Sequence, residues 1–200
     1  MRCLPPELVT APSEPCVSIA DARAHLRVDS IEEDALITAA IAAAVQHLDG
    51  YGGILGRALM KQDWRQFLPF WPASRSVDLA LAPVLSVVSV EARGADGQTV
   101  TVDPASYRLV GGAGAAPRLL FDLGSHLPGL AYAPDAVIVT FSAGYGEAAD
   151  KLPPALKSAI LLMVGDLYRF RDSVQIGASS AVPMSTTVDR LIAPFRRYQI

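Results

Sequence analysis

The sequence predicts an α+β protein: a helical bundle, formed by an N-terminal helix pair and a long C-terminal helix, with an antiparallel β insertion and extended termini. Apolar residues recur at helical spacing in residues 31–49 and 154–172. Residues 59–142 contain short stretches rich in β-branched residues between polar turns. We therefore expect an arm at 1–16, a helical core with the β insertion at 17–172, and a flexible loop with a C-terminal segment at 173–200.

The N-terminal region contains an arm and two helix starts. Four prolines within residues 1–16 favour an extended arm without regular structure. Ser18, with Asp21 three residues later, predicts a capping box at the start of the first helix. Ser30 and Glu33 repeat the pattern and predict the start of a second helix, which ends at glycines 50, 52 and 53.

The second helix has two different faces. One face is an apolar stripe at helical spacing, formed by Ile37, Ile41, Ala44, Val45 and Leu48. Much of the other side is alanine, including Ala39 and Ala43. Helix propensity alone explains these alanines, but so does close packing against another helix, and the sequence leaves both explanations open.

The β insertion is expected to be an antiparallel sheet or a small sandwich. Its strands are expected near residues 59–69, 76–82, 84–94, 98–103, 106–111, 117–122 and 136–142. Asp96-Gly97 predicts a tight hairpin turn between two of them.

The stretch "TFSAGYGEAADKLPPALK" (140–157) has the order strand, glycine turn, helix, which also occurs in phosphate-binding loops. Pro153 and Pro154 lack the N–H groups that such a loop uses, and Glu147 and Asp150 would repel a phosphate. We therefore interpret Gly144-Tyr145-Gly146 as a sharp exit from the sheet.

The helix that follows is apolar on almost all sides. Its broad face contains Leu156, Ala159, Ile160, Met163, Val164, Leu167 and Phe170, and its flanks contain Leu161, Leu162 and Tyr168. Such a helix is buried on more than one side. Either the same domain or a neighbouring subunit covers the flanks.

No catalytic, cofactor-binding or metal-binding motif is present in the sequence. The histidines 25, 47 and 126 are isolated, and the acidic run 32–34 fits the N-terminal dipole of a helix without a metal. Cys3 and Cys16 are expected to be free thiols of a reducing compartment, or at most one optional disulfide.

The composition excludes two classes of partner. The net charge of −3 is not that of a nucleic-acid binder, and the longest apolar runs are too short to cross a membrane. Only 18% of the residues are charged, which suits a protein that covers part of its surface with partners. We expect synthesis as a soluble protein in the cytoplasm.

Several motifs in combination resemble one known family. They are "HLR" (25–27) with "EEDALI" (32–37), then "AGYG", "LPPALK" and "DLYRFRD" within 143–172, and "LIAPFRR" (191–197). This combination resembles the phage head–tail connector family, also called adaptor or head-completion proteins, which long-tailed phages, prophages and gene transfer agents encode. The resemblance covers about residues 17–198.

The resemblance implies a structural virion protein at the head–tail interface and not an enzyme. It implies a dodecameric ring of identical subunits between the portal protein and a tail-side stopper, with double-stranded DNA passing through the channel without specific binding. It also implies that the C-terminal segment binds the portal, through Leu191, Ile192, Phe195, Arg196, Arg197 and Tyr198. The subunit interface is then expected at Leu161, Leu162, Tyr168, Ala39 and Ala43.

Two other functions stay open at this point. A small-molecule-binding or enzymatic α+β domain would use the glycine-rich loops, although no nucleophile–base pair accompanies them. A DNA-binding regulator would use the N-terminal helices, although Arg23 and Arg27 are their only strong cations.

Overall fold

The computed structural model describes residues 4–111, 116–170 and 186–197. The chain divides into two compact units, one formed by residues 1–13 and 60–147 and the other by residues 14–59 and 148–200. The first is a β unit and the second is a helical unit. The α+β class and the antiparallel strands expected from the sequence are therefore confirmed.

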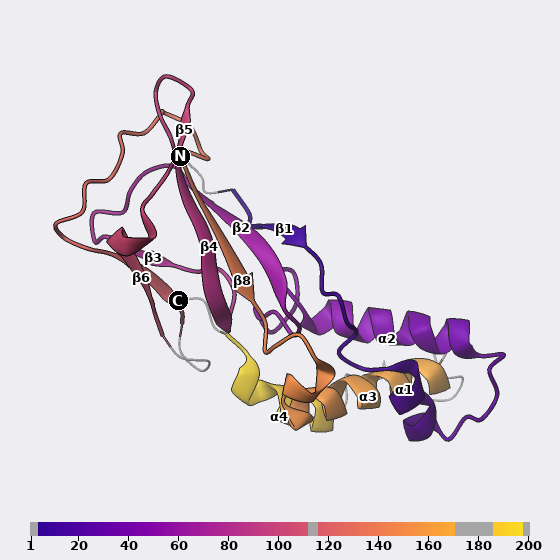
Figure 1. Ribbon diagram of the computed structural model, residues 1–200. Helices are drawn as coiled ribbons and strands as arrows, with labels where there is room; N and C mark the ends of the chain where they lie inside the picture. The colour runs from indigo at the N-terminus through magenta and orange to yellow at the C-terminus, as the bar shows by residue number, and fades with distance from the viewer. Residues whose placement is uncertain (1–3, 112–115, 171–185, 198–200) are drawn as a thin grey trace, which may run out of the picture. The chain divides into compact units, whose positions relative to one another are not determined.

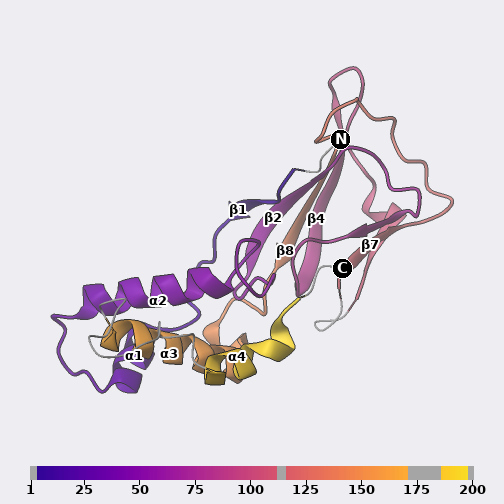
Figure 2. The same cartoon turned by 180° about the vertical axis from the view of Figure 1, so that it is seen from behind.

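The helical unit contains α1 (Ile19–Leu26), α2 (Asp34–Leu48), α3 (Pro154–Arg169) and α4 (Thr186–Ile192), with short 3-10 turns at Ala149–Lys151 and Ala193–Phe195. Helix α3 packs against the other three helices (Figures 1 and 2). Its buried residues are Leu156, Ala159, Ile160 and Val164. None of the helices in the described part of the chain has the length and apolar character needed to cross a membrane.

The first helix begins as the sequence predicts. The Ser18 side chain accepts the N–H of Asp21, and the Asp21 carboxylate accepts the N–H of Ser18, which completes the capping box. The prediction for α2 is wrong by a few residues, because this helix begins at Asp34 and Glu33 is its N-cap. The Ser30 hydroxyl instead accepts the N–H of Glu32 at 3.2 Å, so Ser30 closes a turn before the helix.

The buried stripe of α2 is rotated relative to the predicted stripe. Its fully or nearly fully buried residues are Ile37, Ala40, Ala44 and Leu48, whereas Ile41 and Val45 are only partly buried. Two of the four positions are alanines, which let α2 approach its neighbours closely. On α3, Leu167 is 44% exposed, so it lies at the margin of the broad apolar face expected for this helix.

The β unit contains two antiparallel sheets. The larger has the order β1-β2-β8-β4-β5, with the strands Glu7–Thr10, Gln62–Leu68, Val137–Ala143, Val84–Arg93 and Thr99–Thr101. The smaller has the order β3-β7-β6, with the strands Ser76–Asp78, Arg118–Phe121 and Tyr107–Val110. A 3-10 turn at Pro104–Ser106 precedes β6.

The central strand of the larger sheet, β8, is buried along its whole length. It pairs with β2 in continuous register from Gln62↔Ala143 to Leu68↔Val137. Its pairing with β4 contains two irregularities, one between Val84 and Ser86 and one between Val87 and Ser89. These β-bulges increase the local twist of the sheet.

Strand β1 corrects one expectation about the N-terminal arm. The arm is extended, but Glu7–Thr10 forms regular structure by pairing antiparallel with β2. The prolines at positions 5, 6 and 12 flank these residues and lie outside the strand, which is where proline is tolerated. The pairing partner, β2, is more than 50 residues away, so local sequence did not reveal it.

Candidate functional site

The residue types that bind metal ions do not form a cluster in the described residues. Within them, no group of three or more His, Cys, Asp or Glu side chains has a geometry that could hold a metal ion. Burial raises the pKa of the Cys16 thiol to about 11, with the charge of Asp49 adding to the effect. Cys16 is therefore a protonated thiol of low reactivity. Cys3 lies outside the described residues.

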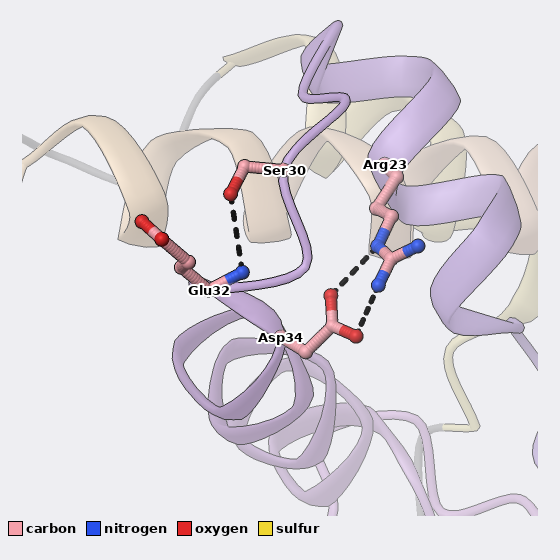
Figure 3. Close-up of polar contacts among 4 residues, drawn as sticks. All are labelled: Arg23, Ser30, Glu32 and Asp34. Carbon is pink, nitrogen blue, oxygen red and sulfur yellow. Dashed lines mark hydrogen bonds and ion pairs between the residues drawn. The ribbon is translucent and has the colours of Figure 1, made fainter.

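The acidic run at the start of α2 is used for internal contacts. The Asp34 carboxylate accepts two hydrogen bonds from the Arg23 guanidinium, one of them from Nε at 2.6 Å (Figure 3). Glu33 accepts the hydroxyl of Tyr168 on α3. The run therefore ties α2 to α1 and α3.

The Gly144-Tyr145-Gly146 turn has the geometry of a sheet exit. Gly144 has a φ of +134°, and a Cβ atom there would lie 2.3 Å from the carbonyl oxygen of Met60. The N–H of Lys61 donates to the carbonyl of Gly146, which closes the turn onto the chain before β2. Helix α3 begins only at Pro154, so the turn and the helix N-terminus do not form one loop.

The C-terminal segment is held by its own helical unit. Val188 and Ile192 of α4 are fully buried, and α4 packs on α3. Arg196 pairs with Asp189 at 2.8 Å, one to two turns earlier. Of the six residues expected to contact a portal, Leu191, Phe195, Arg196 and Arg197 are partly exposed, Ile192 is buried, and Tyr198 lies outside the described residues.

Arg57 fixes this segment, and sequence reasoning did not identify it. Its Nε donates to the carbonyl oxygen of Phe195 at 2.6 Å, and the N–H of Arg197 donates to the carbonyl of Leu55 at 3.0 Å. The loop that carries Arg57 is itself closed by the Asp49 carboxylate, which accepts the N–H of Leu59 at 2.7 Å. A sequence signal existed, because Arg57 is the only charged residue of "GGILGRALM" (52–60), and such a cation needs an acceptor when buried.

The residues expected at a subunit interface fall into two groups. Ala39 and Ala43 lie on the exposed face of α2, next to Leu36, which is 37% exposed. Leu161, Leu162 and Tyr168 on α3 are partly buried. Ala39 and Ala43 are therefore accessible to another molecule, whereas the α3 residues are partly covered by their own unit.

Comparison with known proteins gives matches only at the level of structure. No protein-family model matches the chain, and no curated protein matches its sequence. A chain in the neck of an empty gene transfer agent particle, computed with C6 symmetry, superposes with a TM-score of 0.79 at 28% identity. The alignment covers 98% of this chain and 97% of that one. This chain has the fold of a gene transfer agent neck component.

Two further solved structures agree with this finding. A chain in the virion of a native gene transfer agent particle matches with a TM-score of 0.75 at 27% identity. A chain in the neck of a native particle, computed with C12 symmetry, matches with a TM-score of 0.71 at 25% identity. Both alignments cover 98% of this chain and 97% of the other.

The neck-component fold confirms the resemblance to head–tail connector proteins that the sequence motifs indicated. The matched chains are structural components of a particle and not enzymes, which confirms the expectation that this protein is not an enzyme.

Proposed function

We propose that this protein is a structural virion component of the neck, where it forms a ring that joins the portal protein to a tail-side stopper. The observation that carries the proposal is the match over 98% of the chain to chains of gene transfer agent necks. A match of this extent includes both the helical and the β unit.

The ring is proposed from symmetry and from exposed surface. Two of the matched neck structures were computed with C6 and C12 symmetry, which requires repeated copies around one axis. Each copy in a cyclic ring presents two different patches to its two neighbours. The exposed face of α2 around Ala39 and Ala43 is one such patch, because its small side chains permit close approach.

Portal binding is proposed for the C-terminal segment. Leu191, Phe195, Arg196 and Arg197 are partly exposed at its surface, and aromatic and arginine side chains are frequent in interface hot spots. Ile192 has a different role from the one first expected, because it anchors α4 inside the helical unit. Tyr198, the sixth residue expected to contact the portal, lies outside the described residues.

The proposed channel conducts double-stranded DNA without holding it. The protein has a net charge of −3, so a ring of many copies carries excess negative charge and does not attract phosphates overall. Weak repulsion lets the duplex move along the channel.

Synthesis of the protein in the bacterial cytoplasm precedes its assembly into the particle.

A truncation tests portal binding without disturbing the fold. Removing residues 198–200 leaves every described contact of the C-terminal segment in place, including those of Arg57 and Ile192. With Arg196→Ala added, the truncated protein also loses the partly exposed ion pair of Arg196 with Asp189, which contributes at most about 1 kcal/mol. It is therefore expected to unfold close to the wild-type temperature but to lose co-purification with the portal. Arg190→Ala, at an exposed position of α4, is the matched control and is expected to co-purify normally. Normal binding by the truncated variant would exclude Arg196 and residues 198–200 as the anchor.

A further inference from the structure

The larger sheet of the β unit has an exposed apolar edge at β1. All four residues of β1 are exposed, and among the described residues the strand pairs with β2 on one side only. Leu8 and Val9 are each 48% exposed. Val9 falls where the β1–β2 register shifts, so it is the unpaired residue of a bulge.

The other side of the same sheet has a second apolar edge. Strand β5 pairs only with the end of β4, from Glu91 to Arg93. In the part of the chain that the structure describes, the first half of β4 pairs with β8 alone. Leu85 is 46% exposed and Val88 is 57% exposed, and both fall at the bulges of β4. In both views, β1 and β4 lie on opposite sides of β2 and β8 (Figures 1 and 2).

The bulges affect which kind of contact these two edges can make. A bulge re-aims a side chain and interrupts the backbone ladder, and natural proteins use bulges to prevent uncontrolled edge pairing. Charged side chains such as lysine are another way to protect an edge, yet the residues at these three bulges are Val9, Leu85 and Val88. The edges are therefore suited to a contact between side chains and not to a long continuous sheet.

We infer that Leu8 and Val9 of one copy pack against Leu85 and Val88 of the next copy in the ring. This inference rests on the proposed ring and assigns the β unit to the contact between subunits. Each copy carries both patches on opposite sides of one sheet, which is the requirement for a head-to-tail contact that closes on itself.

The chemistry of the two edges favours a second copy over a different partner. Residues 84–90 contain no charged side chain, and Glu7 is the only one in β1. Neither edge thus offers charges that would recognise a nucleic acid or a strongly charged protein. The two patches match each other because each consists of two aliphatic side chains of similar exposure.

The small size of the patches predicts when the contact forms. Two aliphatic side chains cover far less than the roughly 800 Å² per partner of a stable protein–protein interface. The contact therefore does not hold two free copies together, and forms only when other contacts bring the copies into the ring.

Cysteine cross-linking tests the inference in the assembled ring. Full-length protein with Val9→Cys and Val88→Cys, in a Cys3→Ser background, is assembled with the portal, checked by electron microscopy and treated with a short bismaleimide. A ladder of dimer, trimer and higher species is expected from the double variant, and none from either single variant. Val9→Cys combined with Val110→Cys is the control, because Val110 is 43% exposed but belongs to the smaller sheet.

The outcomes separate this inference from the proposed function. Rings without a ladder would overturn the edge contact and leave the ring in place. Dimers alone from a single variant would show that like edges meet, which also overturns it. If microscopy shows no rings at all, the proposed function fails and the inference fails with it. A charge exchange gives a second readout: Val9→Asp or Val88→Lys alone is expected to abolish rings, and the two together to restore them.

Discussion

The side chain of Arg57 and the backbone carbonyl of Phe195 are joined by a hydrogen bond of 2.6 Å, although they lie 138 residues apart in the sequence. Arg57 is only 6% exposed. The contact connects the loop after α2 to the end of the chain. It therefore holds the described end of the C-terminal segment, which carries part of the proposed portal contact, on the helical unit.

Arg57→Ala is expected to destabilise the protein and to free the C-terminal segment. Removing the donor leaves a partly buried carbonyl without this hydrogen bond, which costs about 1 kcal/mol. Urea unfolding measures the loss of stability, and limited proteolysis is expected to cut faster after residue 190. Arg190→Ala is the control, since this side chain is exposed. An unchanged cleavage rate in Arg57→Ala would show that other contacts hold the segment.

Ile160→Ala is expected to lower the free energy of unfolding by about 2–5 kcal/mol. Ile160 is fully buried on α3, so the truncation leaves a cavity. Leu167→Ala on the same helix is the matched control. Because Leu167 is 44% exposed, its truncation is expected to cost much less. Equal effects of the two substitutions would contradict the described burial of α3.

Gly144→Ala is expected to be strongly destabilising. An alanine at φ +134° is strained, and its Cβ would lie 2.3 Å from the backbone of Met60. Strain of this kind costs about 1–3 kcal/mol, and relief of the clash adds to it. Gly52→Ala is the control, because a Cβ at Gly52 meets nothing within 4 Å. Thermal unfolding of both variants measures the difference, and a Gly144→Ala protein as stable as wild type would refute the turn geometry.

The Asp21 carboxyl is expected to make the free energy of unfolding depend on pH. Lys157, at 3.0 Å, and Ser18 hold the pKa of the Asp21 carboxyl below its ordinary value of 3.8. Because the folded pKa is the lower one, the stabilisation is complete above the ordinary pKa and disappears as pH falls through the folded pKa. Asp21 is exposed enough that the effect is at most about 1 kcal/mol.

Asp21→Asn is therefore expected to be less stable than wild type at about pH 6, and the difference is expected to shrink as pH falls below about 4, as measured by urea unfolding. Asp150→Asn is the control, since the Asp150 side chain is 71% exposed. A difference between wild type and Asp21→Asn that stays constant over this range would rule out the carboxylate charge as its cause.

Local sequence patterns predicted the elements whose contacts are local. The capping box at Ser18 was predicted correctly, because all of its hydrogen bonds lie within residues 18–21. Ser30 misled the prediction of α2, because the same residue type also closes turns two residues ahead. Strand β1 and the contact of Arg57 with Phe195 depend on distant partners, so no local pattern could reveal them.

The candidate interface was only partly visible in the sequence. The exposed alanines of α2 were recognised, but the valines and leucines at the bulges of β1 and β4 look like ordinary core residues until the register is known. The C-terminal apolar residues were read as one group. Only the structure separates Ile192, which is buried, from Leu191 and Phe195, which are partly exposed.

The central claim is that this protein forms a ring on the portal. Negative-stain electron microscopy of the purified protein, with and without the portal protein of the same particle, tests this claim most directly. We predict monomers or loose oligomers for the protein alone, and a closed ring seated on the portal for the mixture. Portal particles without added density, next to free monomers at micromolar concentration, would contradict it.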